Sequence, residues 1–347
     1  MVKWLDSMTS FRSLTSMYFQ DFGFLRPSTQ NVMQNYFNSQ FTCAANNTTC
    51  LNGLNISSII TAGMETFQTA FTLDPAAGQG EPLRPLLDGS FISAPLDLSG
   101  EFPTQIKPLL ITTVAQEAGL TIYGLFPQPL PEPALGNICS ATFGPNRTGV
   151  ILANPLYVPP NGSHDIRPQL EEIGTDSMWR CSSWSFARSW VQNGGTAFVG
   201  KYVVGASYPG NGAVSYCSQP GIVCHQDDIE IVVSFRDLYN LCFQNLFLFI
   251  ACLLPPSLFH TFFFPQFGTV PNPTTAQSAL ISQIQSSYKA FLNNGNPNGD
   301  GLPKWTPATS SDVHPLLLGG SGEAPVGACT PSFWGAQVKY DYQVYNP

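Results

Sequence analysis

Charged side chains are scarce in this sequence. Among 347 residues there are 14 Lys and Arg and 22 Asp and Glu, so charged residues make up only 10%, against about 25% in ordinary soluble domains. The formal net charge is −8. An acidic chain without a basic stripe cannot displace phosphate counterions, which argues against a nucleic-acid partner. The remaining surface must be uncharged and polar, a composition typical of secreted enzymes.

Two further patterns are missing. No Cys-x-x-Cys pair occurs, so zinc and dithiol redox motifs are not supported, and we expect neither a metal nor a cofactor. The N-terminus, residues 1–20, has no apolar core run, and Lys3, Asp6 and Arg12 interrupt it. It is therefore not a signal peptide.

Cysteines and glycosylation sequons are present in number. The nine cysteines are Cys43, Cys50, Cys139, Cys181, Cys217, Cys224, Cys242, Cys252 and Cys329. The sequons begin at Asn46, Asn47, Asn55, Asn146 and Asn161. Together with the low charge, they favour an oxidising secretory compartment and a secreted glycoprotein. A secreted protein normally begins with a signal peptide, and this sequence does not. We therefore expect the start of the protein to be missing.

The pattern of apolar residues predicts alternating strands and helices. Helices are expected from a cap at Ser28, near 59–71, over 183–193 and over 276–292, and strands over 108–111 and 196–205. The stretch 125–161, rich in Pro and Gly, is predicted to be irregular. Strand, helix and strand in sequence favour an α/β architecture.

One segment does not fit this pattern. Residues 233–266 form an apolar insert, and its most apolar part, 246–264, has the length of a membrane span, about 20 residues. However, the adjacent prolines Pro255 and Pro256 lie in its middle and would break a helix. A membrane anchor through 246–264 is therefore kept only as an alternative, and we do not expect the protein to bind a membrane.

The residues around His225 resemble a known family. Gly221–Val232, which includes His-Gln-Asp-Asp-Ile-Glu-Ile-Val, is similar to the histidine loop of the type B carboxylesterases, a family that includes fungal lipases and the cholinesterases. The family pattern continues into Phe-Gly-Thr, which appears here only at Phe267. We therefore interpret 233–266 as a translated intron, because its end codons fit splice sites. A genuine insertion is the alternative.

Other segments match the same family in the same order. They are Asp88–Ile92, the strand 108–111 with the loop Gln116–Gly119, the stretch 183–202, and Gly295–Asn298 with Trp305. The resemblance covers 22–232 and 267–347 and leaves 1–21 unassigned. It implies an α/β-hydrolase fold with a mostly parallel sheet flanked by helices. It also implies that this fold is incomplete, with the N-terminal half of the sheet missing.

The resemblance also implies the chemistry. Ester hydrolysis uses a serine nucleophile, a histidine base and an acid that orients the base, in the chain order Ser, acid, His. Glu117 matches the acid and His225 the base. Asp88 and Asp228 are weaker candidates for the acid. Of the disulfides, the resemblance favours Cys43–Cys50; Cys217–Cys224 and Cys139–Cys181 are further candidate pairs, which would leave Cys329 unpaired.

The nucleophile is not found. No Gly-x-Ser-x-Gly motif occurs, and the nearest sequence, Gly205–Pro209, has Pro in place of the last Gly and lies a short way before the histidine, which is the wrong order for a nucleophile. We therefore predict a carboxylic ester hydrolase by family, acting on small-molecule or lipid esters, that is inactive as this chain is written. The alternatives are a non-catalytic, cholinesterase-like binding module and a membrane-anchored protein.

Overall fold

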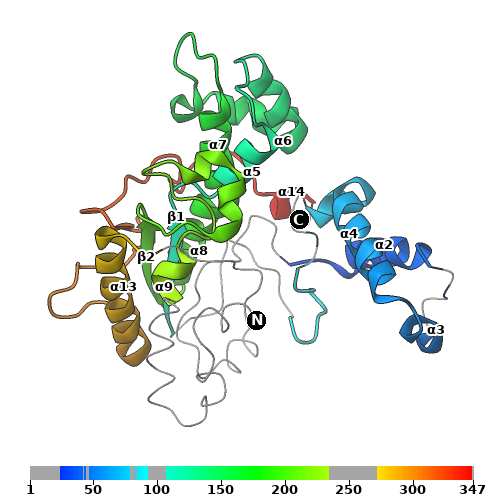
Figure 1. Cartoon of the computed structure of the whole chain (residues 1–347), viewed down its shortest axis with the longest axis horizontal. Coiled ribbons are helices and arrows are strands. Elements are labelled where there is room, and N and C mark those ends of the chain that lie inside the picture. Colours follow the sequence, from blue (N-terminus) through cyan, green and yellow to red (C-terminus); the bar gives the residue numbers. More distant parts are fainter. Residues whose placement is uncertain are drawn as a thin grey trace.

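The computed structural model describes residues 24–41, 43, 47–78, 82, 84–92, 107–233 and 272–345. Its elements, labelled in Figure 1 where there is room, are α2 (Pro27–Ser39), α3 (Thr48–Asn52), α4 (Ile56–Leu73), η1 (Pro75–Ala77), β1 (Pro108–Val114), α5 (Gly119–Leu125), α6 (Ala134–Leu152), η2 (Pro155–Tyr157), α7 (Arg167–Thr175), η3 (Asp176–Arg180), α8 (Cys181–Gln192), β2 (Thr196–Tyr202), η4 (Pro209–Ala213), η5 (Ser215–Ser218), α9 (Ile229–Val233), α13 (Thr275–Asn294), β3 (Leu316–Leu318) and α14 (Asp341–Tyr345). Apart from Val233, the insert 233–266 lies outside the described residues, as does the candidate span 246–264.

A parallel sheet in the order β1-β2-β3 forms the centre of the body. β1 pairs with β2 over its whole length, from Pro108 opposite Thr196 to Val114 opposite Tyr202, and β3 pairs with the end of β2. The strands predicted at 108–111 and 196–205 are therefore confirmed. All carboxyl ends meet at one edge, which is where open α/β sheets place their functional groups.

Helices cover both faces of this sheet (Figure 1). Alternate residues of a strand point to opposite faces, and the two core clusters follow that alternation. Leu109 and Ile111 pack with α8, through Trp184 and Trp190 among others. Leu110 packs on the other face with residues of α13. Burial on both faces explains why β1 reads as a continuous apolar run rather than an alternating one.

Helix α13 has complete signals at both ends. Thr274 accepts the backbone N–H of Gln277, whose side chain accepts the backbone N–H of Thr274 in return, which forms a capping box. Gly295 ends the helix in the left-handed region, with φ of 72°. The helices predicted near 59–71, over 183–193 and over 276–292 are confirmed as α4, α8 and α13.

Two sequence-based predictions about helices are wrong. The stretch 125–161 contains α6, which bends where Gly144 has φ of 76° and Pro145 starts a second helical run. Proline at a first helical position is favourable, so this Gly-Pro pair restarts the helix instead of preventing it. In α2 the cap position is Arg26, not Ser28, and it makes no side-chain capping bond.

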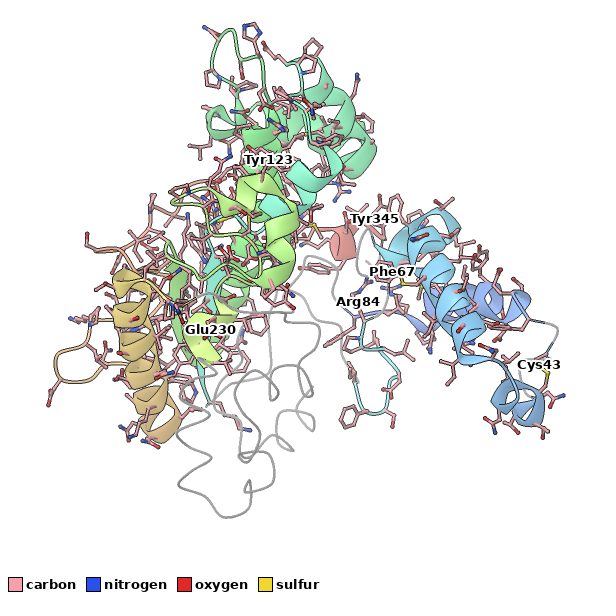
Figure 2. The ribbon with its side chains drawn as sticks, in the orientation of Figure 1. Cys43, Phe67, Arg84, Tyr123, Glu230 and Tyr345 are labelled. Atoms are coloured by element: carbon pink, nitrogen blue, oxygen red, sulfur yellow. A yellow bond between two sulfur atoms is a disulfide. The ribbon has the colours of Figure 1, made fainter. Side chains whose placement is uncertain are left out.

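A separate helical lobe, formed by α2, α3, α4 and η1, lies to one side of the body (Figure 1). Leu25 joins it to the segment after η1 through two backbone hydrogen bonds, to Pro85 O and from Leu87 N–H. At its junction with the body the ring of Phe71 meets that of Tyr345, 6.4 Å between centroids; Figure 2 labels Tyr345 beside this lobe. No helix among the described residues is long and apolar enough to cross a membrane.

Three disulfides link described cysteines. Cys43 bonds to Cys50, the pair that the family resemblance favoured, and Cys217 bonds to Cys224, which was a further candidate pair. The predicted pair Cys139–Cys181 is wrong, because Cys181 bonds to Cys329 across 148 residues. Cys139 is buried and free, and burial raises the pKa of its thiol to about 11.

Candidate active site

The acid loop, residues 115–119, follows the carboxyl end of β1. Glu117 is buried within it, and its Oε1 accepts the backbone N–H of Val114 at 2.8 Å, which fixes the carboxylate against the strand that it follows. Ala118 donates its N–H to Thr175 Oγ1 at 3.0 Å. Ala118 has an ordinary right-handed backbone, with φ of −79°. The residue between Glu117 and Gly119 therefore needs no glycine conformation.

The base loop, residues 222–228, follows η4 and η5 and carries His225. Asp227 organises it: its Oδ1 accepts Tyr208 N–H and Asn211 Nδ2, and its Oδ2 accepts Cys224 N–H, each at 2.8 Å. Asn211 Nδ2 also donates to His225 O at 2.9 Å. Both carboxylate oxygens of Asp227 are thus occupied by backbone and amide donors, so Asp227 is not an acid for the imidazole.

The two loops bring Glu117 and His225 together. Glu117 Oε2 lies 2.6 Å from His225 Nδ1, with the glutamate side chain 7% exposed and the histidine 33% exposed. A carboxylate at Nδ1 holds the proton on that nitrogen, so Nε2 is the basic one. It also stabilises the imidazolium that forms when Nε2 takes a proton. The arrangement is a buried carboxylate held against a partly exposed imidazole at the carboxyl edge of a parallel sheet.

A π-helical turn, η3, borders this pair. Trp179 from η3 lies against the imidazole of His225, with ring centroids 5.6 Å apart. The next residue, Arg180, is buried and donates to Ala115 O at 2.9 Å. It also pairs with Glu172 at 2.6 Å and with Asp176 at 3.0 Å. Single π-turns are rare and occur often at functional sites.

The two weaker acid candidates have different surroundings. Asp88 is exposed in a turn, where its Oδ1 accepts the backbone N–H groups of Ser90, Phe91 and Ile92 and these bonds lower its pKa. Asp228 lies in the base loop, and burial, with the nearby Glu117 carboxylate, raises its pKa to about 7. A carboxyl group that holds its proton near neutrality is a poor partner for an imidazolium.

The remaining candidate residues can also be placed. Asn47, Asn55, Asn146 and Asn161 are all exposed, whereas Asn46 lies outside the described residues. Where the structure describes the chain, Asp176 with Cys181 and Cys329 forms a group with the spacing of a metal site. The two sulfur atoms are bonded to each other, so only the carboxylate could serve as a ligand.

Two residues at the site were not found from the sequence. Gln116 joins the two loops through its backbone and its side chain, and Trp179 faces the imidazole. A glutamine beside a candidate acid carries no signal of its own. Trp179 lies 46 positions before His225, and only the turn of η3 brings its ring to the loop.

The comparisons with known proteins agree with this architecture. Neither protein-family profiles nor curated proteins gave a match to the sequence. Among solved structures, the carboxylesterase Est55 of Geobacillus stearothermophilus is similar at a TM-score of 0.57 and 15% identity, over 91% of this chain and 57% of that chain. A thermophilic PNB esterase is similar at 0.54 and 15%, over 88% and 53%.

The chain has the α/β-hydrolase fold, with a mostly parallel sheet flanked by helices. It spans about half the length of the solved esterases that it resembles: 53% of another PNB esterase, at a TM-score of 0.52 and 14% identity. At such identities the likeness establishes the fold, and function must be argued from the site.

Proposed function

We propose that this chain belongs to the type B carboxylesterase family and carries the acid–base half of a serine ester-hydrolase site. The observation that supports this most directly is the 2.6 Å contact between Glu117 Oε2 and His225 Nδ1. Both groups follow strands of one parallel sheet in the chain order that the α/β-hydrolase site uses for its acid and its histidine.

In the proposed reaction His225 moves the protons. Its Nε2 takes the proton of a hydroxyl nucleophile as that oxygen attacks the ester carbonyl, and returns the proton to the departing alcohol. Glu117 keeps the imidazole in the correct tautomer and stabilises its charged form. The substrates are carboxylic esters, of small molecules or lipids, and no step calls on a metal or cofactor.

The nucleophile limits what this chain can do alone. The sequence contains no Gly-x-Ser-x-Gly, and a base and acid without nucleophile and oxyanion donors retain little of the rate enhancement. We expect the purified chain to leave p-nitrophenyl butyrate unhydrolysed above background. Turnover that a fluorophosphonate probe blocks would overturn this part of the proposal.

The acid–base pair itself can be tested without turnover. A histidine Nδ1 proton held by a buried carboxylate gives a far-downfield proton NMR line, which Glu117→Gln should abolish. The matched control is Glu323→Gln, because Glu323 Oε2 faces His314 Nδ1 at 3.1 Å in an exposed pair. If Glu117→Gln leaves the spectrum unchanged, the proposed role of the pair is wrong.

A second candidate, a non-catalytic binding module of the same fold, is favoured by the missing nucleophile motif. The two candidates differ in the genomic sequence upstream of Met1. An in-frame Gly-x-Ser-x-Gly, joined to this chain in transcripts, would support the esterase. Transcripts that begin at Met1 would support the binding module.

We also propose that the protein is secreted and glycosylated and that 233–266 is a translated intron. The exposure of Asn47, Asn55, Asn146 and Asn161 supports glycosylation. Chain expressed through a secretory host should lose mass on treatment with an N-glycosidase, and an unchanged mass would contradict the proposal. Transcripts in which the codons of Val232 and Phe267 are adjacent would support the intron; transcripts that retain the segment would oppose it.

A further inference from the structure

We propose that Gln116 and the Cys217–Cys224 disulfide are positioning elements that hold the acid loop against the base loop and so set the contact between Glu117 and His225. The inference rests on the proposed function for the role of that pair. The inference goes beyond the proposed function because it assigns the alignment of Glu117 and His225 to groups that touch neither a substrate nor the reacting atoms.

Gln116 forms two hydrogen bonds with the backbone of a single base-loop residue, Val223. Its backbone N–H donates to Val223 O at 3.0 Å, and its side-chain Oε1 accepts Val223 N–H at 2.8 Å. Gln116 and Cys224 thereby form an isolated parallel bridge beyond the end of the sheet. Glu117 follows Gln116 directly and His225 follows Cys224 directly, so this bridge sets the register of the two functional residues.

The Cys217–Cys224 disulfide contacts the acid loop at the same junction. Cys217 and Cys224 are both buried, at 2% and 0% exposure. A Cβ added to Gly119 would lie 3.0 Å from Cys224 Sγ and 3.0 Å from the ring of Tyr216. The acid loop therefore contacts the sulfur atom and the neighbouring tyrosine, and any side chain at position 119 would have to push these groups aside by a few tenths of an ångström.

An aromatic stack continues this contact. Tyr123 on α5, which follows the acid loop, stacks on Tyr216, which precedes Cys217, with ring centroids 3.6 Å apart and planes at 4°. Arg167 lies over the Tyr123 ring at 4.7 Å. The helix after Glu117 and the turn before His225 are thus packed together as well as hydrogen-bonded.

The chain provides a matched control for the disulfide. Cys43–Cys50 has the same sequence separation, seven, and nearly the same Cα–Cα distance, 5.7 Å against 5.6 Å for Cys217–Cys224. Equal loops constrain the unfolded chain equally. Removing either bond should therefore lower the melting temperature similarly, whereas only Cys217–Cys224 should affect His225.

The experiment follows the downfield Nδ1 proton line of His225 in the full chain, with the melting temperature measured for every variant. Gln116→Ala should broaden or remove the line, and Gln116→Glu, which keeps an acceptor oxygen for Val223 N–H, should restore it. The glutamine control is Gln343→Ala, because Gln343 also accepts a backbone N–H, that of Tyr340, far from the site. It should leave the line in place.

For the disulfides, Cys217→Ser with Cys224→Ser should remove the line, and Cys43→Ser with Cys50→Ser should keep it. A line that persists in both Gln116→Ala and the Cys217/Cys224 variant, in protein that remains folded, overturns the positioning role. Loss in both disulfide variants at equal destabilisation also overturns it, because the effect would then be general. If instead Glu117→Gln does not change the wild-type line, the proposed function itself has failed.

Discussion

Two disulfides close loops of equal length in different surroundings. Cys43–Cys50 lies in the helical lobe, next to residues 47–49, which are exposed, and Figure 2 labels Cys43 at the far end of that lobe. Cys217–Cys224 lies beneath the acid loop and directly precedes His225. The crosslink is the same in both loops. Its effect on the protein depends on the groups that the closed loop contacts.

Two features of the base loop carry a free-energy cost. Gln226 has φ of 75°, a left-handed conformation that costs a residue with a side chain free energy. Asp228 is a partly buried carboxyl group beside Glu117. In the lobe, Asn47 caps α3 by accepting Cys50 N–H at 3.0 Å, which is a favourable local interaction. Gln226 and Asp228 follow Cys224 closely, so these costs fall beside the crosslink that precedes His225, whereas the described part of the lobe loop contains a favourable cap.

The third disulfide extends this comparison and should have the largest effect. Cys181–Cys329 closes a loop of sequence separation 148. By the chain-entropy relation it contributes about 5 kcal/mol, against about 2.5 kcal/mol for either loop of separation seven. Cys181→Ser with Cys329→Ser should therefore lose about twice as much free energy of unfolding in urea as the Cys43/Cys50 variant. Equal losses would show that loop length does not govern these crosslinks.

Asp228→Asn should stabilise the protein above neutral pH. The folded state raises the pKa of Asp228 from 3.8 to about 7, so it binds this proton more tightly than the unfolded state does. The resulting cost is absent below about pH 4 and grows as the pH rises to 7. A shift of about three pKa units corresponds to about 4 kcal/mol, so we expect a gain of at most about 4 kcal/mol at pH 8 and none at pH 4, measured by denaturant unfolding at both values.

Asp88 provides the control of opposite sign. Backbone hydrogen bonds lower the pKa of Asp88, so its ionised form stabilises the folded state above the unfolded pKa and loses that effect as the pH falls. Asp88→Asn should therefore destabilise the protein at pH 8. A gain there, or a loss in Asp228→Asn, would contradict the contrast between the exposed turn and the base loop.

The smallest expected effect concerns the left-handed residue. Gln226→Gly should stabilise the chain by roughly 1 kcal/mol, because glycine adopts a positive φ without a steric penalty. Gln40 is the matched glutamine at the end of α2, with an ordinary φ of −74°. Gln40→Gly should destabilise by a similar amount. Thermal unfolding of both variants would test this, and the same sign in both would exclude strain at Gln226.

The site could be predicted only in part. The family resemblance selected Glu117 and His225, and the structure brings the two side chains together. Burial on both faces made β1 visible as an apolar run. The Pro- and Gly-rich composition of 125–161, by contrast, suggested irregular structure where α6 in fact forms, because a pair such as Gly144-Pro145 is also compatible with the start of a new helical run.

By itself, the sequence determined the elements whose signals are local. Apolar patterning predicted β1, α8 and α13, the family resemblance favoured Cys43–Cys50, and Cys217–Cys224 was a further candidate pair. Tertiary structure alone decided which distant groups meet: Cys181 with Cys329, Gln116 with Val223 and Trp179 with His225. The physical reason is that local patterns record which face of an element is buried, whereas partner choice depends on how the chain folds back on itself.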